Sequence, residues 1–166
     1  MASFSGKCVV LTDEGRPKCV EDLKRGDYVW GGHMIRAIVY TALEEPVEMT
    51  TFATGLLITP WHPIRKSPAE PWEYPAEISG ATTGLFNMKG YYNIVLEKGH
   101  VIELNGYQVC TLGHGFTDNA TVYHNYFGTD AVIEDLRLRD GWAEGVVQLS
   151  LSNVRRNRFT RVVEKI

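Results

Sequence analysis

The stretch Thr59-Pro60-Trp61-His62-Pro63 decides the fold assignment, and it stands directly after the apolar run Leu56-Leu57-Ile58. The apolar run is typical of a short buried strand. The two prolines stiffen the backbone on either side of His62, so that the end of the strand presents its imidazole rigidly. Thr59 lies three residues earlier, and both side chains are expected to reach one small polar site. By spacing alone, a histidine bonded to a loop carbonyl is the favoured interpretation.

A second segment repeats this arrangement later in the chain. Thr111-Leu112-Gly113-His114 also places Thr-x-x-His at the end of a β run, which here begins after Gly106. A repeat of two similar β halves would explain the match. The sequence therefore hints at an internal duplication.

Short apolar runs separated by turn signals recur through most of the chain. They cover residues 8–11, 27–30, 34–43, 56–59, 91–96, 101–104 and 107–112. Asn105-Gly106 is the strongest hairpin signal among the turns. Helical spacing is confined to residues 130–139, where Val132, Ile133, Leu136 and Leu138 predict one short helix. The pattern predicts a mainly β domain built from hairpins.

Two segments have no regular apolar period. Residues 65–83 carry three prolines around Trp72 and Tyr74, and they predict an irregular surface segment held by its aromatic rings. The tail, residues 153–166, is strongly basic, so it can dock on an acidic surface of this chain or of a partner. We favour the alternative, a strand whose arginines face water, because Val154, Phe159, Val162 and Val163 supply apolar positions.

Composition bounds the class of protein. The chain has 166 residues, 44% of them hydrophobic and 22% charged, which predicts one folded domain over residues 1–166. The net charge of −3 excludes a polycation that binds nucleic acid. The sequence shows neither an apolar run of membrane-spanning length nor a signal peptide at its start, so no membrane partner is expected. We expect a monomer.

The cysteines indicate the compartment. Cys8, Cys19 and Cys110 are too few for a disulfide framework, and they favour reduced thiols in an intracellular protein.

Several motifs in a fixed order carry a family resemblance. Ser3 to Leu11, followed by Val20-Glu21-Asp22-Leu23-Lys24-Arg25-Gly26-Asp27-Tyr28-Val29, resembles the opening of a hedgehog/intein (Hint) domain. Thr59 to Pro63 is similar to the T-x-x-H motif of that superfamily, and Tyr92 to His100 with Asn105-Gly106 to its late β segment. Thr111-Leu112-Gly113-His114-Gly115 and His124-Asn125-Tyr126-Phe127-Gly128-Thr129 resemble the Vint branch, the Hint-like domains attached to von Willebrand A modules.

The resemblance implies an architecture. We expect the Hint fold of β-hairpins with pseudo-two-fold halves over about residues 3–115. A C-terminal extension with one short helix is expected over about residues 116–166.

The resemblance also implies a self-processing reaction. Ser3 falls on the position of the nucleophile that attacks the carbonyl before it, in an N-to-S or N-to-O acyl shift followed by cleavage or transfer. His62 is implied to protonate the leaving nitrogen, and Thr59 to hold the scissile amide or stabilise the oxyanion as a hydroxyl donor. The partner is then the chain's own N-terminal flanking segment, expected to be a von Willebrand A-type module.

The sequence departs from the family at several positions. Cysteine is typical where Ser3 stands, so we hypothesise that it replaces a cysteine in a chain shortened to the domain, which makes this form inert or slow. Val109-Cys110-Thr111 stands where splicing inteins end in His-Asn, so splicing by asparagine cyclisation is not expected. Asn93 stands where inteins often carry an aspartate.

Other candidates have two interpretations each. His100 occupies the late histidine position and is either a group that helps to resolve the ester or a turn histidine. Cys110 is either a second nucleophile or a buried strand thiol, and His114 is a candidate for the same site through the repeat. His33 and His124 are expected to be structural or exposed.

Two other functions remain open. One is a zinc-binding module that uses Cys110, His114 and a third ligand such as Cys8, although structural zinc usually takes four protein ligands. The other is a β-rich protein-interaction module that uses the aromatic residues 61–74. The self-processing hypothesis requires neither a metal nor a cofactor.

Overall fold

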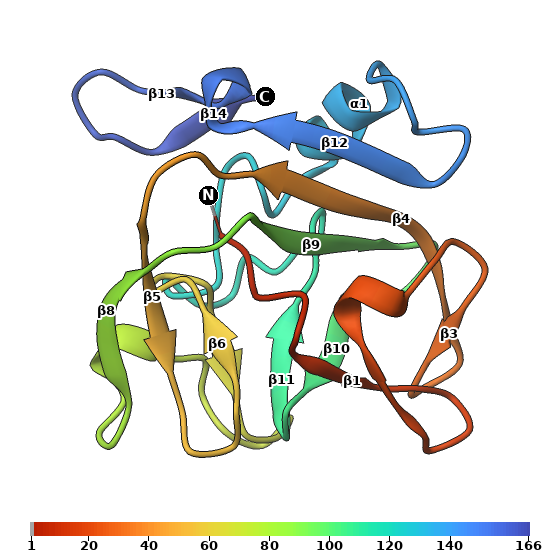
Figure 1. Cartoon of the computed structure of the whole chain (residues 1–166), viewed down its shortest axis with the longest axis vertical. Helices are drawn as coiled ribbons and strands as arrows, with labels where there is room; N and C mark the ends of the chain where they lie inside the picture. The colour runs from red at the N-terminus through yellow and green to blue at the C-terminus, as the bar shows by residue number, and fades with distance from the viewer. Residues whose placement is uncertain (1) are drawn as a thin grey trace.

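The structure, a computed structural model, describes residues 2–166. It is mainly β, as the sequence predicts, and its strands form three larger sheets and one small hairpin (Figure 1). A five-stranded sheet has the order β2 (Pro17–Cys19), β1 (Val9–Leu11), β10 (Val101–Leu104), β11 (Tyr107–Cys110) and β7 (Ile64–Arg65). A three-stranded sheet has the order β6 (Leu57–Ile58), β5 (Val47–Thr51) and β8 (Thr82–Phe86).

The longest strand, β4 (His33–Ala42), organises the rest. It pairs with β3 (Tyr28–Val29), β9 (Gly90–Leu96) and, in parallel, β12 (Val146–Ser150). Ile35 and Ile38 belong to one hydrophobic cluster, whereas Ala37 and Val39 belong to another. Both faces of β4 are therefore buried, which explains its nearly continuous apolar sequence.

The C-terminal extension covers the second face of β4. It contains α1 (Asp130–Arg137), β12 and the hairpin of β13 (Arg155–Arg156) and β14 (Val163–Lys165), which lie together across the top of Figure 1. The Thr129 hydroxyl accepts from the Ala131 amide and caps α1, while Val132 and Leu136 are buried in the cluster beneath. The predicted helix is confirmed. It ends at Arg137, and Leu138 is 86% exposed rather than part of the apolar face.

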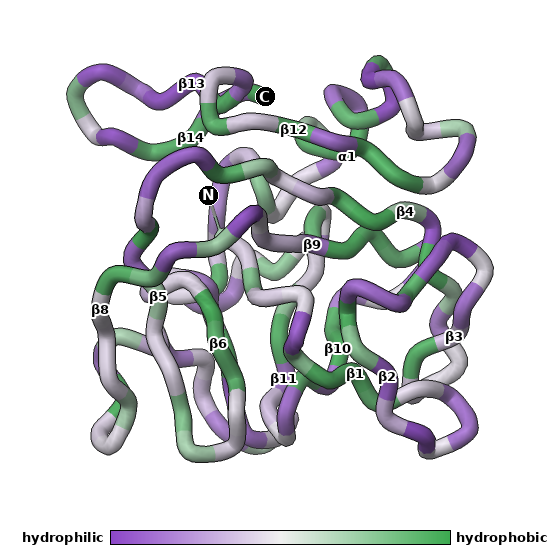
Figure 2. Tube along the Cα trace, in the orientation of Figure 1, coloured by the Kyte–Doolittle hydropathy of each residue, from purple (hydrophilic) through white to green (hydrophobic). Residues whose placement is uncertain are grey.

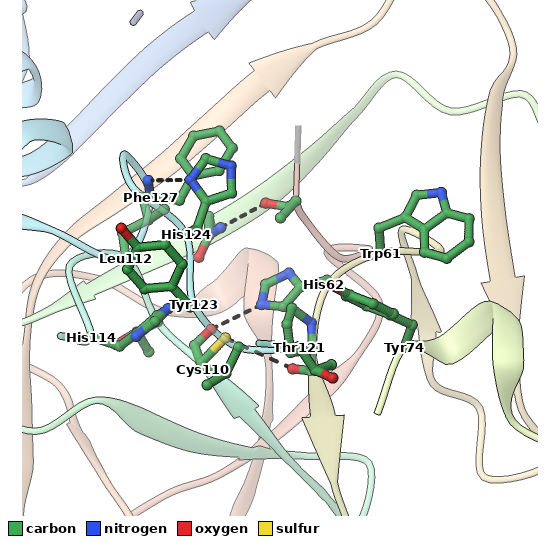
Figure 3. A pocket seen from close by; sticks show the side chains of 15 residues that line it. Trp61, His62, Tyr74, Cys110, Leu112, His114, Thr121, Tyr123, His124 and Phe127 are labelled. Atoms are coloured by element: carbon green, nitrogen blue, oxygen red, sulfur yellow. Dashed lines mark hydrogen bonds between the residues drawn. The ribbon is translucent and has the colours of Figure 1, made fainter. Parts of the chain in front are cut away.

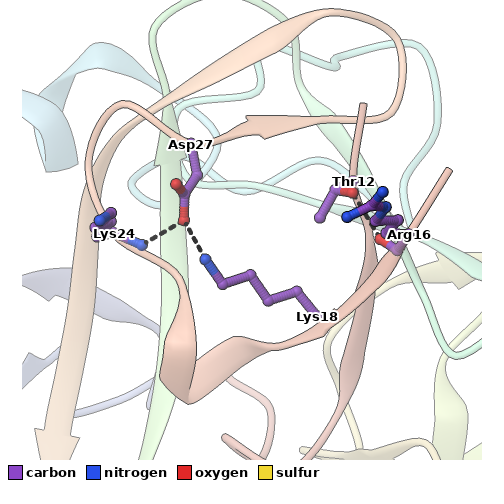
Figure 4. Close-up of polar contacts among 5 residues, drawn as sticks. All are labelled: Thr12, Arg16, Lys18, Lys24 and Asp27. Atoms are coloured by element: carbon purple, nitrogen blue, oxygen red, sulfur yellow. Dashed lines mark hydrogen bonds and ion pairs between the residues drawn. The ribbon is translucent and has the colours of Figure 1, made fainter. Parts of the chain in front are cut away.

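Local turns follow the sequence signals. Asn105 and Gly106 both have positive φ, 48° and 83°, and join β10 to β11 as Asn-Gly hairpin turns do. In the Gly26-Asp27 segment, the Asp27 carboxylate accepts from the Lys24 amide at 3.0 Å and from Lys18 Nζ at 3.1 Å (Figure 4). That family-like motif thus shapes a turn, and it lines neither cavity beside Ala2.

The two irregular segments behave as expected, with one correction. Trp72 is buried under the Arg65 guanidinium and anchors residues 65–83, which also include the 3-10 turn Pro75–Glu77. The arginines of the tail are exposed, and Figure 2 shows hydrophilic residues around β13 against hydrophobic stretches on β4, β6 and β10. Phe159, however, is 84% exposed and packs into neither core cluster.

Within residues 2–166, no helix is long and apolar enough to cross a bilayer.

Candidate functional site

Residues 3–5 are buried. Ser3, Phe4 and Ser5 are 1%, 0% and 6% exposed. The Phe4 amide donates to the Tyr92 carbonyl at 3.0 Å, and the Tyr92 amide donates back at 2.8 Å. On the other side, the Ser5 amide donates to the Leu57 carbonyl at 2.9 Å. Residues 3–5 therefore run as an extended segment between β6 and β9, with the Ala2–Ser3 peptide bond held inside.

Thr59 holds the nitrogen side of that bond. The Ser3 amide donates to Thr59 Oγ1 at 2.9 Å, and the Thr59 amide donates to the Ser3 carbonyl at 2.8 Å. Thr59 directly follows β6, so the strand fixes its position. The resemblance implied a hydroxyl donor, but in this geometry the Thr59 hydroxyl accepts. It fixes the orientation of the Ala2–Ser3 peptide plane.

Two donors hold the oxygen side of the same bond. The Ala2 carbonyl oxygen accepts from Ser3 Oγ at 2.7 Å and from Asn93 Nδ2 at 2.7 Å. Asn93 Oδ1 accepts from the Ile94 amide at 2.8 Å, which fixes the side-chain amide with its NH₂ group toward Ala2. Donors placed in this way stabilise negative charge that develops on a carbonyl oxygen.

Sequence reasoning missed this role of Asn93, because it treated the residue as a departure from an aspartate. The available signal was a polar residue within an otherwise apolar strand. Asn93 is 2% exposed, and a buried amide needs hydrogen-bond partners.

The His62 imidazole has one ring nitrogen without a hydrogen-bond partner among residues 2–166. Its Nε2 lies 2.9 Å from the Cys110 carbonyl oxygen, which can only accept, so Nε2 carries the hydrogen. The lone pair is then on Nδ1, a buried atom with no hydrogen-bond partner among residues 2–166. Burial lowers the pKa of His62 to about 4, so the imidazole is neutral at pH 7. The ring packs against Phe4 with 5.7 Å between ring centroids.

Ala2, Asn93 and His62 line a cavity of about 270 Å³ (Figure 3). The two Thr-x-x-His segments both reach it, since Thr111 and His114 line it together with His62. Thr111 Oγ1 is the second buried polar atom without a partner in the described part of the chain. The remaining lining residues are mostly apolar or aromatic, and several of them come from the extension: Thr121, Val122, Tyr123, His124 and Phe127.

Cys110 and His114 line the cavity as a protonated thiol and a neutral imidazole. Burial raises the pKa of the Cys110 thiol to about 12, so it stays protonated and is a poor nucleophile. Its backbone carbonyl orients His62 instead. Burial likewise lowers the pKa of His114 to about 4, and His114 Nδ1 accepts from the Phe116 amide at 2.9 Å. His114 is therefore neutral, with its hydrogen on Nε2.

The structure does not bring His100 to this cavity. His100 is exposed and lines a separate depression with Arg36 and Arg137. The residues considered for zinc are also dispersed, because Cys8 and Cys110 lie in different hydrophobic clusters. Across residues 2–166, no three His, Cys, Asp or Glu side chains are grouped so that they could hold a metal ion.

His124 was expected to be structural or exposed, and it takes part in the hydrogen bonds of its own loop. It is half-buried and lines the cavity beside Ala2. Its Nδ1 accepts from the amides of Tyr126 at 3.1 Å and Phe127 at 2.9 Å, so the neutral ring carries its hydrogen on Nε2. His124 therefore has a donor to offer, whereas His62 has an acceptor. The sequence does not reveal the difference, because it arises from the local loop.

The buried state of His62 predicts a loss of stability in acid. Its pKa is about 4 in the fold against 6.5 normally, so below pH 6.5 the unfolded chain binds a proton that the folded chain refuses. Stability is complete above pH 6.5 and falls between pH 6.5 and 4, by about 3 kcal/mol from this residue. Urea unfolding at several pH values measures the loss, and the His62→Gln variant should lose less. An identical pH dependence in both proteins would contradict the assignment.

Comparisons with known proteins were made for sequence and for structure. A family model described as Vint, a Hint-domain, matches residues 2–165. No curated protein matches the sequence. Among solved structures, the fold is similar to a DnaB intein from Synechocystis sp. PCC 6803, with a TM-score of 0.51 and 12% identity over 67% of this chain and 99% of that one. The fold is also similar to a bacterial intein-like domain from Clostridium thermocellum, with a TM-score of 0.53 and 13% identity over 67% of this chain and 99% of that one.

Proposed function

Since the chain belongs to the Vint family of Hint domains, we propose that it is a self-processing domain that breaks the peptide bond between residues 2 and 3. One observation carries the proposal. Separate side chains hold the two ends of that single peptide unit, Thr59 at its nitrogen and Asn93 at its oxygen, while the Ser3 hydroxyl lies against the same oxygen. A purely structural role for the segment does not require three side chains on one peptide bond.

The first step is an N-to-O acyl shift. Ser3 Oγ bonds to the Ala2 carbonyl carbon, the carbon–nitrogen bond breaks, and the hydroxyl proton passes by way of His62 Nδ1 to the departing nitrogen. The products are an ester on Ser3 and a free amine at the same residue. Asn93 Nδ2 stabilises the oxyanion that forms in between. Because nucleophile and carbonyl belong to adjacent residues, orientation supplies about 7–11 kcal/mol of the barrier.

In the second step an external nucleophile attacks the ester and releases the upstream segment, which we propose to be the flanking module of the precursor. Burial raises the pKa of the Cys110 thiol to about 12, which favours an external nucleophile over Cys110. Serine at position 3 makes the first step slower than cysteine would, since a hydroxyl is a weaker nucleophile than a thiol.

The test uses a precursor with a soluble reporter and a flexible leader joined before residue 3. Mass spectrometry follows the release of the leader in the precursor with Ser3 and in the Ser3→Cys variant. We expect hydroxylamine to release it from both, and an added thiol to release it faster from Ser3→Cys with a thiol adduct on the leader. Ser152→Cys places an exposed thiol elsewhere and serves as the control, which should not respond to thiol. Failure of both precursors to release the leader would overturn the proposal.

A further inference from the structure

A second depression begins at Ala2 and runs between the core and the extension. It has a volume of about 420 Å³ and shares Ala2, Trp61, His124 and Phe127 with the cavity that contains His62. We call it the upstream groove. Its further walls come from the core through Val47, Glu48, Thr59, Pro60 and Tyr91, and from the extension through Leu151, Arg156, Val162 and Val163.

Exposed apolar side chains gather in this groove. Trp61, Leu151 and Val162 are 59%, 43% and 39% exposed, and all three line it. Apolar surface that is left open next to a reacting bond indicates a binding site rather than a chance exposure.

The path of the backbone leads into the groove. Residues 3–5 run antiparallel beside β6, with Phe4 opposite Ile58 and the Thr59 amide bonded to the Ser3 carbonyl. Continued in the same direction, a preceding residue passes Pro60 and Trp61, which form the core wall of the groove. In Figure 1 the first described residues, in red, start just below β4, which the extension covers from above.

The charges at the rim do not select a charged occupant. Glu48 and Arg156 are both exposed and of opposite sign, and Arg156 Nη1 already donates to the Arg161 carbonyl at 3.0 Å within the hairpin. The remaining walls offer mostly apolar contacts. An apolar segment therefore fits the groove better than an acidic or a basic one.

We propose that the upstream groove binds the two or three residues that precede the scissile bond, in an extended conformation, with an apolar side chain against Trp61, Leu151 and Val162. The C-terminal extension is thus a specificity element of the self-processing domain. This inference rests on the proposed function, because it takes the segment upstream of Ser3 as the substrate. A solved intein of similar fold aligns with 67% of this chain and 99% of its own length, so about a third of this chain has no counterpart in it.

The first test measures binding of the leader in the upstream groove with a variant that cannot cleave it. In the Ser3→Ala background no ester forms, and a leader ending in Val-Leu-Ala is compared with one ending in Asp-Asp-Ala before residue 3. Amide hydrogen exchange is read in the hairpin, residues 155–165, and in residues 121–127. We expect about tenfold slower exchange with the apolar leader, since burying a side chain of this size shifts a local equilibrium by about that factor. Equal exchange with both leaders would overturn the inference, whatever the outcome of the cleavage test.

The rate test uses the Ser3→Cys precursor with the apolar leader. Val162→Asp places a charge in the groove, whereas Phe159→Asp places one at the exposed end of the same hairpin, outside the groove. We expect Val162→Asp to slow leader release by about tenfold and Phe159→Asp to leave it unchanged. Leu151→Asp repeats the test from the other extension wall, in case Val162→Asp disturbs the hairpin. Equal rates in all of these variants would contradict the inference.

Discussion

Replacement of His62 by alanine is expected to slow leader release from a precursor by about 10²–10⁴-fold, the usual contribution of a positioned acid–base group. Among the histidines that line the cavity, His62 alone has a buried ring nitrogen, Nδ1, that lacks a partner among the described residues. Its Nε2 donates to the Cys110 carbonyl. The Nδ1 atoms of His114 and His124 already accept hydrogen bonds from backbone amides of their own loops. No other side chain of the cavity is placed to take its role as the base.

The measurement is the single-turnover rate of the Ser3→Cys precursor, with and without His62→Ala. His100→Ala is the matched comparison. The family resemblance makes His100 a candidate for resolving the ester, but the structure places it at a separate depression. We therefore expect His100→Ala to leave the rate unchanged. A large effect at His100 and none at His62 would overturn this account of the site. Circular dichroism of both variants shows whether the fold is kept.

Replacement of Asn93 by alanine is expected to slow the same step by about 10²–10³-fold, as the loss of one oxyanion donor does in other acyl transfers. Asn93 Nδ2 lies 2.7 Å from the Ala2 carbonyl oxygen, the atom that gains charge in the acyl shift. The readout is again the single-turnover release of the leader.

Asn93→Asp separates a donor role from a merely structural one. An ionised carboxylate accepts hydrogen bonds but cannot donate one, and it repels the developing oxyanion. We expect this variant to be slow at neutral pH and to gain activity as the pH is lowered, when the carboxyl group becomes protonated and can donate. If Asn93→Asp and Asn93→Ala show the same pH profile, Asn93 acts by packing alone.

Several features could be predicted because they depend on near neighbours in the chain. Asn105-Gly106 adopts positive φ at both residues, and so it closes the hairpin wherever the hairpin lies. The helix starting at Asp130 follows from its apolar spacing and the Thr129 cap. The position of Thr59 and His62 directly after a short strand also follows from the local sequence, and there the His62 amide donates to the Thr59 carbonyl at 3.3 Å. In each case the deciding contacts lie within a few residues.

Other features depend on contacts that no local pattern records. Asn93 becomes a donor to Ala2 because β9 lies beside the first residues of the chain, 91 positions away in sequence. His124 enters the site because the extension folds back over β4. His100 occupies the late histidine position of the family motifs, but it does not line the cavity. It follows the turn after β9 and lines a different depression.

By itself, the sequence determined the mainly β class and the short helix, because apolar periodicity, turn residues and caps act over a few neighbouring residues. The Hint fold was implied only by the resemblance of its ordered motifs to that family. The tertiary structure alone decided which atoms face the Ala2–Ser3 bond and which imidazole nitrogen has no hydrogen-bond partner among the described residues. Those properties arise from burial and from hydrogen bonds between distant strands, and their partners are fixed only when the sheets and the extension pack together.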